Sequence, residues 1–151
     1  MRLETWLITA FDYDVWANKR WLNRIGTMPD PQRATEVFEH ILTAQRVWLE
    51  RCGVAIELQK SDQATAAILD QIAGGWRYFL ERTDLNELIT YQNYAGQTFR
   101  NTVSEIALHV INHGTYHRGH LRGLADQGKG AEFEDTDLIL FFRDGFPKPV
   151  S

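Results

Sequence analysis

The sequence predicts an all-α protein built as a four-helix bundle, and two observations carry this prediction. Apolar side chains recur at steps of three and four residues along four long segments, which is the spacing of one helix face. Glycines, prolines or a loss of this period separate the segments. A chain of 151 residues has the length of one domain, so we expect residues 1–151 to form a single helical-bundle domain.

The first two helices are predicted at residues 3–25 and 34–52. Gly26 and Pro29 end the first helix, and Gly53 is a suitable residue just after the second. The predicted buried face of the first helix contains Trp6, Ala10, Tyr13, Ala17 and Trp21. That of the second helix contains Val37, Ile41, Ala44, Val47 and Trp48. We expect both faces to lie in the core.

The third helix is predicted at residues 61–83, with Ser61 as its N-cap. Gly74 and Gly75 are a weak point within it, where the helix can kink or a neighbouring element can approach closely. Residues 84–101 lose the helical period and are rich in aromatic and β-branched side chains. We therefore expect a short hairpin or an extended loop between the third and fourth helices.

The fourth helix is predicted at residues 102–127. Thr102 and Glu105 have the spacing of a capping box, in which each side chain satisfies a backbone N–H of the other residue. Gly128 follows the end of the helix. Residues 135–143 predict a short C-terminal amphipathic helix, and we expect the tail beyond them to be disordered.

Composition and charge argue against several classes of function. The net charge is −4 and the sequence has no basic run, which disfavours a nucleic-acid-binding protein. No stretch approaches the ~18 apolar residues of a membrane span, and the N-terminal segment does not resemble a signal peptide. Cys52 is the single cysteine, so we expect a cytoplasmic protein in which this residue is a small apolar side chain rather than a reactive thiol.

Four of the five histidines fall within twelve residues of the fourth predicted helix. Taking His109 as the origin of a helical wheel, His113 lies at roughly 40° and His117 at roughly 80°. His120 lies at roughly 20°, so all four share one face. Residues four apart are neighbours on a helix surface, so His113 and His117 can reach one metal ion.

The apolar positions on the same wheel place His117 inside the buried sector and His113 at its flank. His109 and His120 lie at the edge of this sector. A buried imidazole without a partner is unfavourable, whereas neutral imidazole is a good ligand for zinc, nickel, copper or iron. His40 flanks the apolar face of the second helix and can supply a third ligand. Three protein ligands leave a position open, which is the pattern of catalytic rather than structural metal sites.

The same residues also allow interpretations without a metal. Four histidines on one face can form a solvated surface or a pH-sensitive patch. A single histidine such as His40 is often an ordinary hydrogen-bonded side chain. In a plain helical bundle, His113 and His117 would instead bond to Asn112, Glu105 or backbone groups.

Three segments carry motifs in three of the predicted helices: residues 14–18 (DVWAN), 40–48 (HILTAQRVW) and 109–121 (HVINHGTYHRGHL). Together they resemble the DinB (damage-inducible) family of four-helix metalloproteins. The family signature is His-x₂-Asn-His-x₃-His-Arg-Gly-Gln, with an aromatic-Trp-Ala-Asn element in the first helix and a His…Trp element in the second. The matches follow the family's order and span most of the chain. His120 stands where the family has Gln.

The resemblance implies an up-down-down-up bundle with one long crossover, often as a homodimer. It implies a divalent metal held by His40, His113 and His117, with zinc or nickel expected first and iron, copper or manganese as alternatives. Relatives include thiol-dependent S-transferases and isomerases. The resemblance does not settle the reaction, and our first hypothesis is a metal-dependent enzyme of the thiol S-transferase type that acts on a small molecule with a low-molecular-weight thiol.

The reaction itself stays open at the level of the sequence. His109 or His120 is a candidate acid–base partner and Tyr116 a weaker one. Arg118 either contacts an anionic group or forms a structural salt bridge. A metal-dependent hydrolase would use the same site with water as the nucleophile. A non-catalytic protein would use the metal for stability or sensing and act through dimer contacts.

Overall fold

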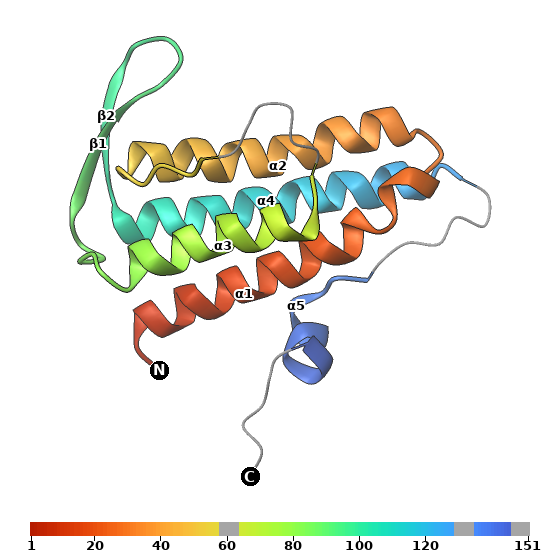
Figure 1. The fold of residues 1–151 in the computed structure, drawn as a ribbon, viewed down its shortest axis with the longest axis horizontal. Helices are drawn as coiled ribbons and strands as arrows, with labels where there is room; N and C mark the ends of the chain where they lie inside the picture. The colour runs from red at the N-terminus through yellow and green to blue at the C-terminus, as the bar shows by residue number, and fades with distance from the viewer. Residues whose placement is uncertain (58–63, 129–134, 146–151) are drawn as a thin grey trace.

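Four long helices form an up-down-down-up bundle in the computed structural model, which describes residues 1–57, 64–128 and 135–145. The helices are α1 (Leu3–Leu22), α2 (Pro31–Arg51), α3 (Ala66–Leu80) and α4 (Val103–Ala125). Figure 1 shows α1 and α4 running in one direction and α2 and α3 in the other. The all-α prediction is therefore confirmed, as is the order of directions implied by the family resemblance.

The helix ends differ from the predicted ones by a few residues. Helix α2 begins at Pro31 because the Asp30 carboxylate accepts a hydrogen bond from the Arg33 N–H, and proline suits the first helical position. Helix α1 ends at Leu22, ahead of a 3₁₀ turn at Ile25–Thr27. Both differences follow from local hydrogen bonds, which the spacing of apolar residues does not reveal.

Helix α3 begins later than predicted, at Ala66, where the Thr65 hydroxyl accepts from the Ile68 N–H. The predicted cap Ser61 lies outside the described residues. The end of α2 agrees with its prediction, because Gly53 has a φ of +81° just after the helix. The N–H groups of Gly53 and Val54 bond back to the Glu50 and Leu49 carbonyls, which completes a Schellman motif.

A β-hairpin connects α3 to α4, so of the two predicted forms of this connection the hairpin is correct. Strands β1 (Leu88–Gln92) and β2 (Thr98–Thr102) pair antiparallel, with Leu88 opposite Thr102 and Gln92 opposite Thr98. The turn contains Gly96, whose φ of +77° favours glycine. Strand β2 leads directly into α4, and Thr102 and Glu105 form the predicted capping box.

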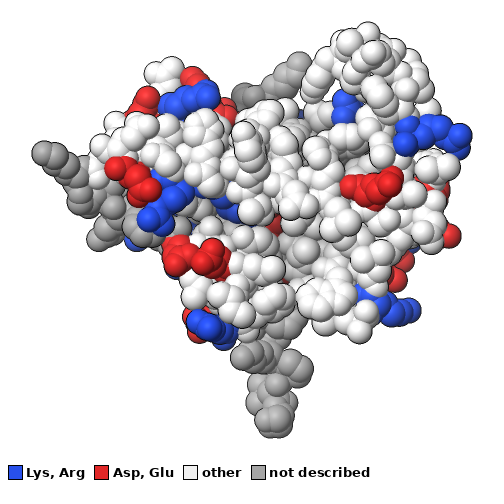
Figure 2. Space-filling view, turned by 180° about the vertical axis from the view of Figure 1, so that it is seen from behind, with Lys and Arg blue, Asp and Glu red and all other residues white. Residues whose placement is uncertain are grey.

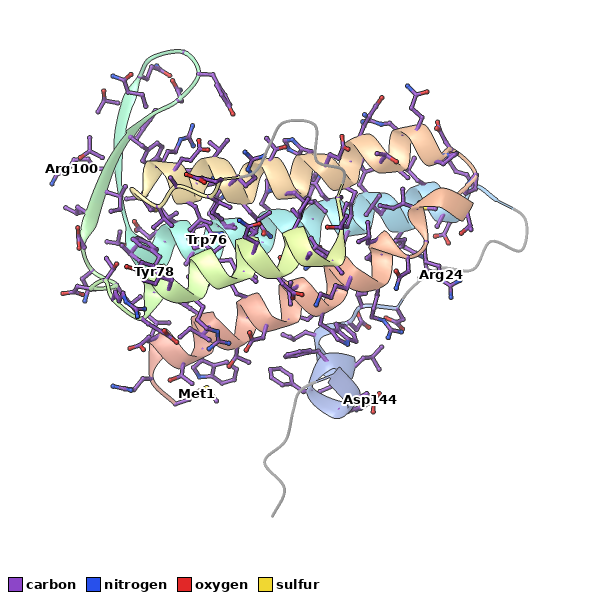
Figure 3. All side chains as sticks on the ribbon, in the orientation of Figure 1. Met1, Arg24, Trp76, Tyr78, Arg100 and Asp144 are labelled. Carbon is purple, nitrogen blue, oxygen red and sulfur yellow. The ribbon has the colours of Figure 1, made fainter. Side chains whose placement is uncertain are left out.

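The core lies between the four long helices, and Trp76 is fully buried within it (Figure 3). Trp21 is also buried, whereas Trp16 and Trp48 are half-buried. The predicted burial of Trp6 is wrong, because its side chain is 48% exposed. It lies near the start of α1, where it packs edge-on against Phe142 rather than into the bundle.

The predicted short C-terminal helix is present as the helical turns α5 (Leu138–Leu140) and η2 (Phe141–Gly145). They lie against the outer side of α1 in Figure 1, where Phe141 joins Tyr13 and Ala17 in a second apolar cluster. The predicted disordered tail falls on residues 146–151, which lie outside the described part of the chain. Asp144, labelled in Figure 3, lies in η2 just before this tail.

Charged side chains are interspersed on the face shown in Figure 2, where basic and acidic groups alternate and leave wide uncharged areas between them. On the hairpin, Arg100 extends away from the bundle (Figure 3). Within the described residues, no helix combines the length and the apolar character that crossing a membrane requires.

Candidate metal centre

Helices α2 and α4 bring three histidines together. His40 comes from α2, and His113 and His117 come from successive turns of α4. One ring nitrogen of each residue lies within 4.8 Å of the others. The ring centroids are 4.4 Å apart for His113 and His117, and 4.6 Å apart for His40 and His117. The predicted juxtaposition of these side chains is therefore present, although His40 is distant in sequence from the other two.

The distance between the two α4 histidines suits a shared ion. Nε2 of His113 and Nε2 of His117 are 3.2 Å apart, and two imidazole nitrogens on one tetrahedral zinc ion would be about 3.3 Å apart. A hydrogen bond between a protonated and an unprotonated nitrogen would give a similar distance. Such a bond does not explain why the imidazole of His40 converges on the same point, whereas a metal ion would use all three.

Electrostatics keep two of these imidazoles neutral. The pKa of His113 is lowered to about 4, mainly by burial and further by repulsion from His117, His40 and His109. The pKa of His117 is also lowered, first by burial and then by His40 and His120. Neutral imidazoles have a free lone pair at neutral pH. The donor set is therefore chemically ready for a divalent cation.

The histidines are less buried than the wheel predicted. His113 and His117 are half-buried, and His40, His109 and His120 are exposed. The buried face of α4 includes Val110, Gly114, Arg118 and Leu121. His117 thus lies at the edge of the buried sector rather than inside it. The wheel placed the buried sector too close to His117 because it was oriented by apolar residues alone, whereas Gly114 and Arg118 are buried as well.

The contacts expected of a metal-free bundle are not those that form. The amide of Asn112 donates to the Leu108 carbonyl, and the Glu105 carboxylate accepts from the Thr102 N–H and the Asn101 amide. Within the described residues, neither side chain forms a hydrogen bond with His113 or His117. Nδ1 of His117 is buried and has no hydrogen-bond partner among the described residues.

A buried ion pair lies behind the histidines. Arg118 and Asp14 are each only 3% exposed, and Nη1 of Arg118 donates to Oδ1 of Asp14 at 2.5 Å. The same nitrogen donates to Asn18 at 2.8 Å, and Nε2 of Gln45 donates to the second carboxylate oxygen of Asp14. Of the two roles predicted for Arg118, the structural salt bridge is therefore correct.

This network requires a glycine in α4. A Cβ at Gly114 would lie 2.6 Å from Oδ1 of Asp14, which is too close for any real contact. Burial opposes the charge on Arg118, but attraction to Asp14 outweighs it, and the pKa of Arg118 is raised. Sequence analysis missed the network, although two polar residues four apart within the apolar face of α1, Asp14 and Asn18, were a signal of it.

Two cavities flank the histidines along the groove between α2 and α4. One, of about 350 Å³, is lined by His40 and His117 together with Arg33, Glu36, Val37 and His120. The other, of about 260 Å³, lies towards the hairpin and includes His109. The two acid–base candidates thus lie in different cavities. Tyr116 is 75% exposed and contacts the ring of His117 from outside.

Cys52 lies apart from this groove, at the end of α2. Burial raises the pKa of its thiol to about 11. The thiol is therefore protonated at neutral pH, which agrees with the predicted role as a small apolar side chain rather than a nucleophile.

Comparison with known proteins adds two findings. The model of a family described as the DinB family matches residues 3–143. A curated relative named Protein DinB, from Bacillus subtilis (strain 168), is 29% identical over 157 aligned positions, which cover 87% of this chain and 91% of the relative. No solved structure matches the chain significantly.

Proposed function

The chain belongs to the DinB family, and we propose that it is a metal-dependent enzyme of the thiol S-transferase type. His40, His113 and His117 would hold the divalent metal ion, zinc or nickel in the first instance. The observation that carries the proposal is the convergence of three imidazole nitrogens within 4.8 Å. Three protein ligands leave a coordination position for an exchangeable group, as in catalytic sites.

The two cavities favour a transferase over a hydrolase. A transfer between two organic molecules needs room for both, and the groove offers one cavity on each side of the histidines. A hydrolase needs one such cavity and a water molecule. We assign the thiol to the cavity that His40 and His117 line, because its polar side chains Arg33 and Glu36 suit a small polar molecule.

The side chains of the groove would then position the reactants and accept the proton of the thiol. A bound divalent ion would act as a Lewis acid and would lower the pKa of a thiol. In the transfer, the sulfur forms a bond to carbon, and the bond from that carbon to the leaving group breaks with its electron pair. The thiol proton passes to a ring nitrogen of His120, which lines the same cavity.

Elemental analysis of purified protein tests the metal site. We expect about one zinc or nickel ion per chain after dialysis against either metal, and none in a His113→Ala, His117→Ala double variant. His120→Ala is the matched control, because it removes an exposed imidazole from the same helix and leaves the three ligands in place. Native protein that takes up neither metal would refute the proposal.

The reaction is tested with metal-loaded protein, a panel of small thiols and an alkyl halide. We expect thioether formation that the double ligand variant loses and that His120→Ala slows. Hydrolysis of esters or amides without any S-transfer would favour the hydrolase. A loaded protein that shows neither activity, and whose metal has four protein ligands by X-ray absorption, would favour the non-catalytic role.

A further inference from the structure

The cavity towards the hairpin is lined by residues that have no role in the proposed metal site. It lies where the hairpin meets α2 and α4, and its lining defines what we call the aromatic pocket: Trp48, Tyr91, Asn101, Glu105, Ile106 and His109. Three of the six are aromatic rings. The hairpin supplies Tyr91 and Asn101 from opposite strands, so the pocket exists only because the hairpin folds against the bundle.

The walls of the aromatic pocket are held in place by specific contacts. The hydroxyl of Tyr91 donates to Oδ1 of Asn101 at 2.8 Å. The ring of Trp48 packs edge-to-face with Tyr91 at 4.8 Å and with His109 at 5.2 Å. The Arg51 guanidinium lies over the rings of Trp48 and Tyr91, at 4.5 and 5.1 Å. The rings are therefore ordered before any ligand arrives.

Size and charge restrict what the aromatic pocket can bind. An apolar cavity of about 150 Å³ accommodates benzene, so about 260 Å³ accommodates one ring with its substituents. The carboxylate of Glu105, an exposed residue of the lining, repels an anion. An organic cation would gain little from Trp48 and Tyr91, because Arg51 already occupies positions over both rings.

The aromatic pocket adjoins the histidine cluster through His109. The ring of His109 lines the pocket, and its centroid is 5.8 Å from that of His113. A molecule with its ring in the pocket would therefore place its next substituent beside His113.

We propose that the aromatic pocket, formed by the hairpin, Trp48 and His109, binds an uncharged aromatic ring of the electrophilic substrate. The identity of the ligand as an electrophile rests on the proposed transferase function, but binding of the ring does not.

Binding is tested with benzyl alcohol as the probe, followed by the indole N–H signal of Trp48 in ¹⁵N-labelled protein. We expect a saturable shift of this signal, and weaker responses to cyclohexylmethanol and to benzoate. Tyr91→Ser removes one wall and should weaken binding about fivefold to tenfold. Tyr91→Phe keeps the ring and should retain binding. Tyr94→Ser is the matched control, since Tyr94 is 92% exposed on the same hairpin and does not line the pocket.

The outcomes separate this proposal from the proposed function. The His113→Ala, His117→Ala variant should still bind benzyl alcohol, whether or not the native protein is a metalloenzyme. An unchanged Trp48 signal would overturn the proposal, and so would equal losses in Tyr91→Ser and Tyr94→Ser. If thioether formation is found, Tyr91→Ser should raise the KM for benzyl bromide and leave that for iodomethane unchanged. An equal rise for both would contradict the assignment of the pocket to the electrophile.

Discussion

At Gly114, α4 comes so close to α1 that only a hydrogen atom fits between them. The carboxylate of Asp14 and the guanidinium of Arg118 occupy the space into which a side chain would extend. Both charges are buried, so each depends on the other for compensation. The residue beside this contact is His113, so the packing of one glycine helps to position a proposed ligand.

Gly114→Ala should therefore destabilise the fold. The added Cβ would lie 2.6 Å from Oδ1 of Asp14 and 3.1 Å from Nη1 of Arg118, so one of these charged groups must move. We expect a loss of about 2 kcal/mol in the free energy of unfolding, measured by urea titration. Gly119→Ala is the matched control, because nothing lies within 4 Å of its Cβ and alanine favours a helix. Equal losses in the two variants would contradict the steric argument.

The histidine cluster should make the metal-free protein sensitive to acid. The pKa of His113 is lowered to about 4 in the folded state, against about 6.5 in an unfolded chain. Between these values the unfolded chain binds more protons, so stability falls as the pH drops from about 6.5 towards 4. Urea midpoints of chelator-treated protein at pH 7 and pH 5 measure the effect.

His113→Gln is the variant that isolates this contribution. It removes the titrating imidazole and relieves the repulsion on its neighbours, so the difference between the two urea midpoints should shrink. A smaller difference should remain, because the pKa of His117 is lowered as well. An unchanged pH dependence in the variant would show that other groups cause the acid sensitivity.

At the scale of elements, α4 is defined at its start by a capping box rather than by its apolar period. The Thr102 hydroxyl accepts from the Glu105 N–H at 3.2 Å, and the Glu105 carboxylate accepts from the Thr102 N–H at 2.8 Å. Thr102 is also the last residue of β2. The cap thus fixes where the hairpin ends and where the helix that carries four histidines begins.

Thr102→Ala should cost about 1 kcal/mol of unfolding free energy, because the Glu105 N–H loses its partner at the start of a helix. Thermal or urea unfolding measures the change. Thr43→Ala provides the comparison, since Thr43 is an exposed residue in the middle of α2. It should be neutral or slightly stabilising, given the higher helix propensity of alanine. A neutral Thr102→Ala variant would mean that the hairpin alone determines the start of α4.

At the scale of the whole molecule, the C-terminal turns complete the outer side of α1. The ring of Phe141 lies 5.9 Å from that of Tyr13 and 5.7 Å from that of Trp16. Tyr13 in turn lies beneath the guanidinium of Arg118 and donates to the Thr136 carbonyl. The C-terminal segment is therefore connected through α1 to the buried ion pair.

Phe141→Ala should destabilise the whole protein rather than release the C-terminal segment alone. Phe141 is 2% exposed, and loss of a buried phenylalanine side chain costs about 3 kcal/mol or more. The urea midpoint should fall with a single transition. Ile139→Ala, at a side chain that is 52% exposed, should change the midpoint little. An early separate transition in Phe141→Ala would show that this segment unfolds independently.

Features that depend on residues close together in the chain were predictable from the sequence. Apolar side chains that recur every three to four residues indicated the four long helices, and the Thr102–Glu105 spacing indicated the cap of α4. Both were visible because helix and cap hydrogen bonds join residues that are close in the chain. The four-residue spacing of His113 and His117 put them side by side for the same reason. The start of α2 was missed although its signal, Asp30 followed by Pro31, is equally local.

Contacts between side chains of different elements could not be predicted in the same way. Burial between helices α1 and α4 pairs Arg118 with Asp14, which decides between the two roles predicted for this arginine. The antiparallel packing of α2 on α4 brings His40 to the α4 histidines, and the hairpin brings Tyr91 to Trp48. Such contacts depend on how whole apolar faces pack against each other, and no short stretch of sequence contains that information.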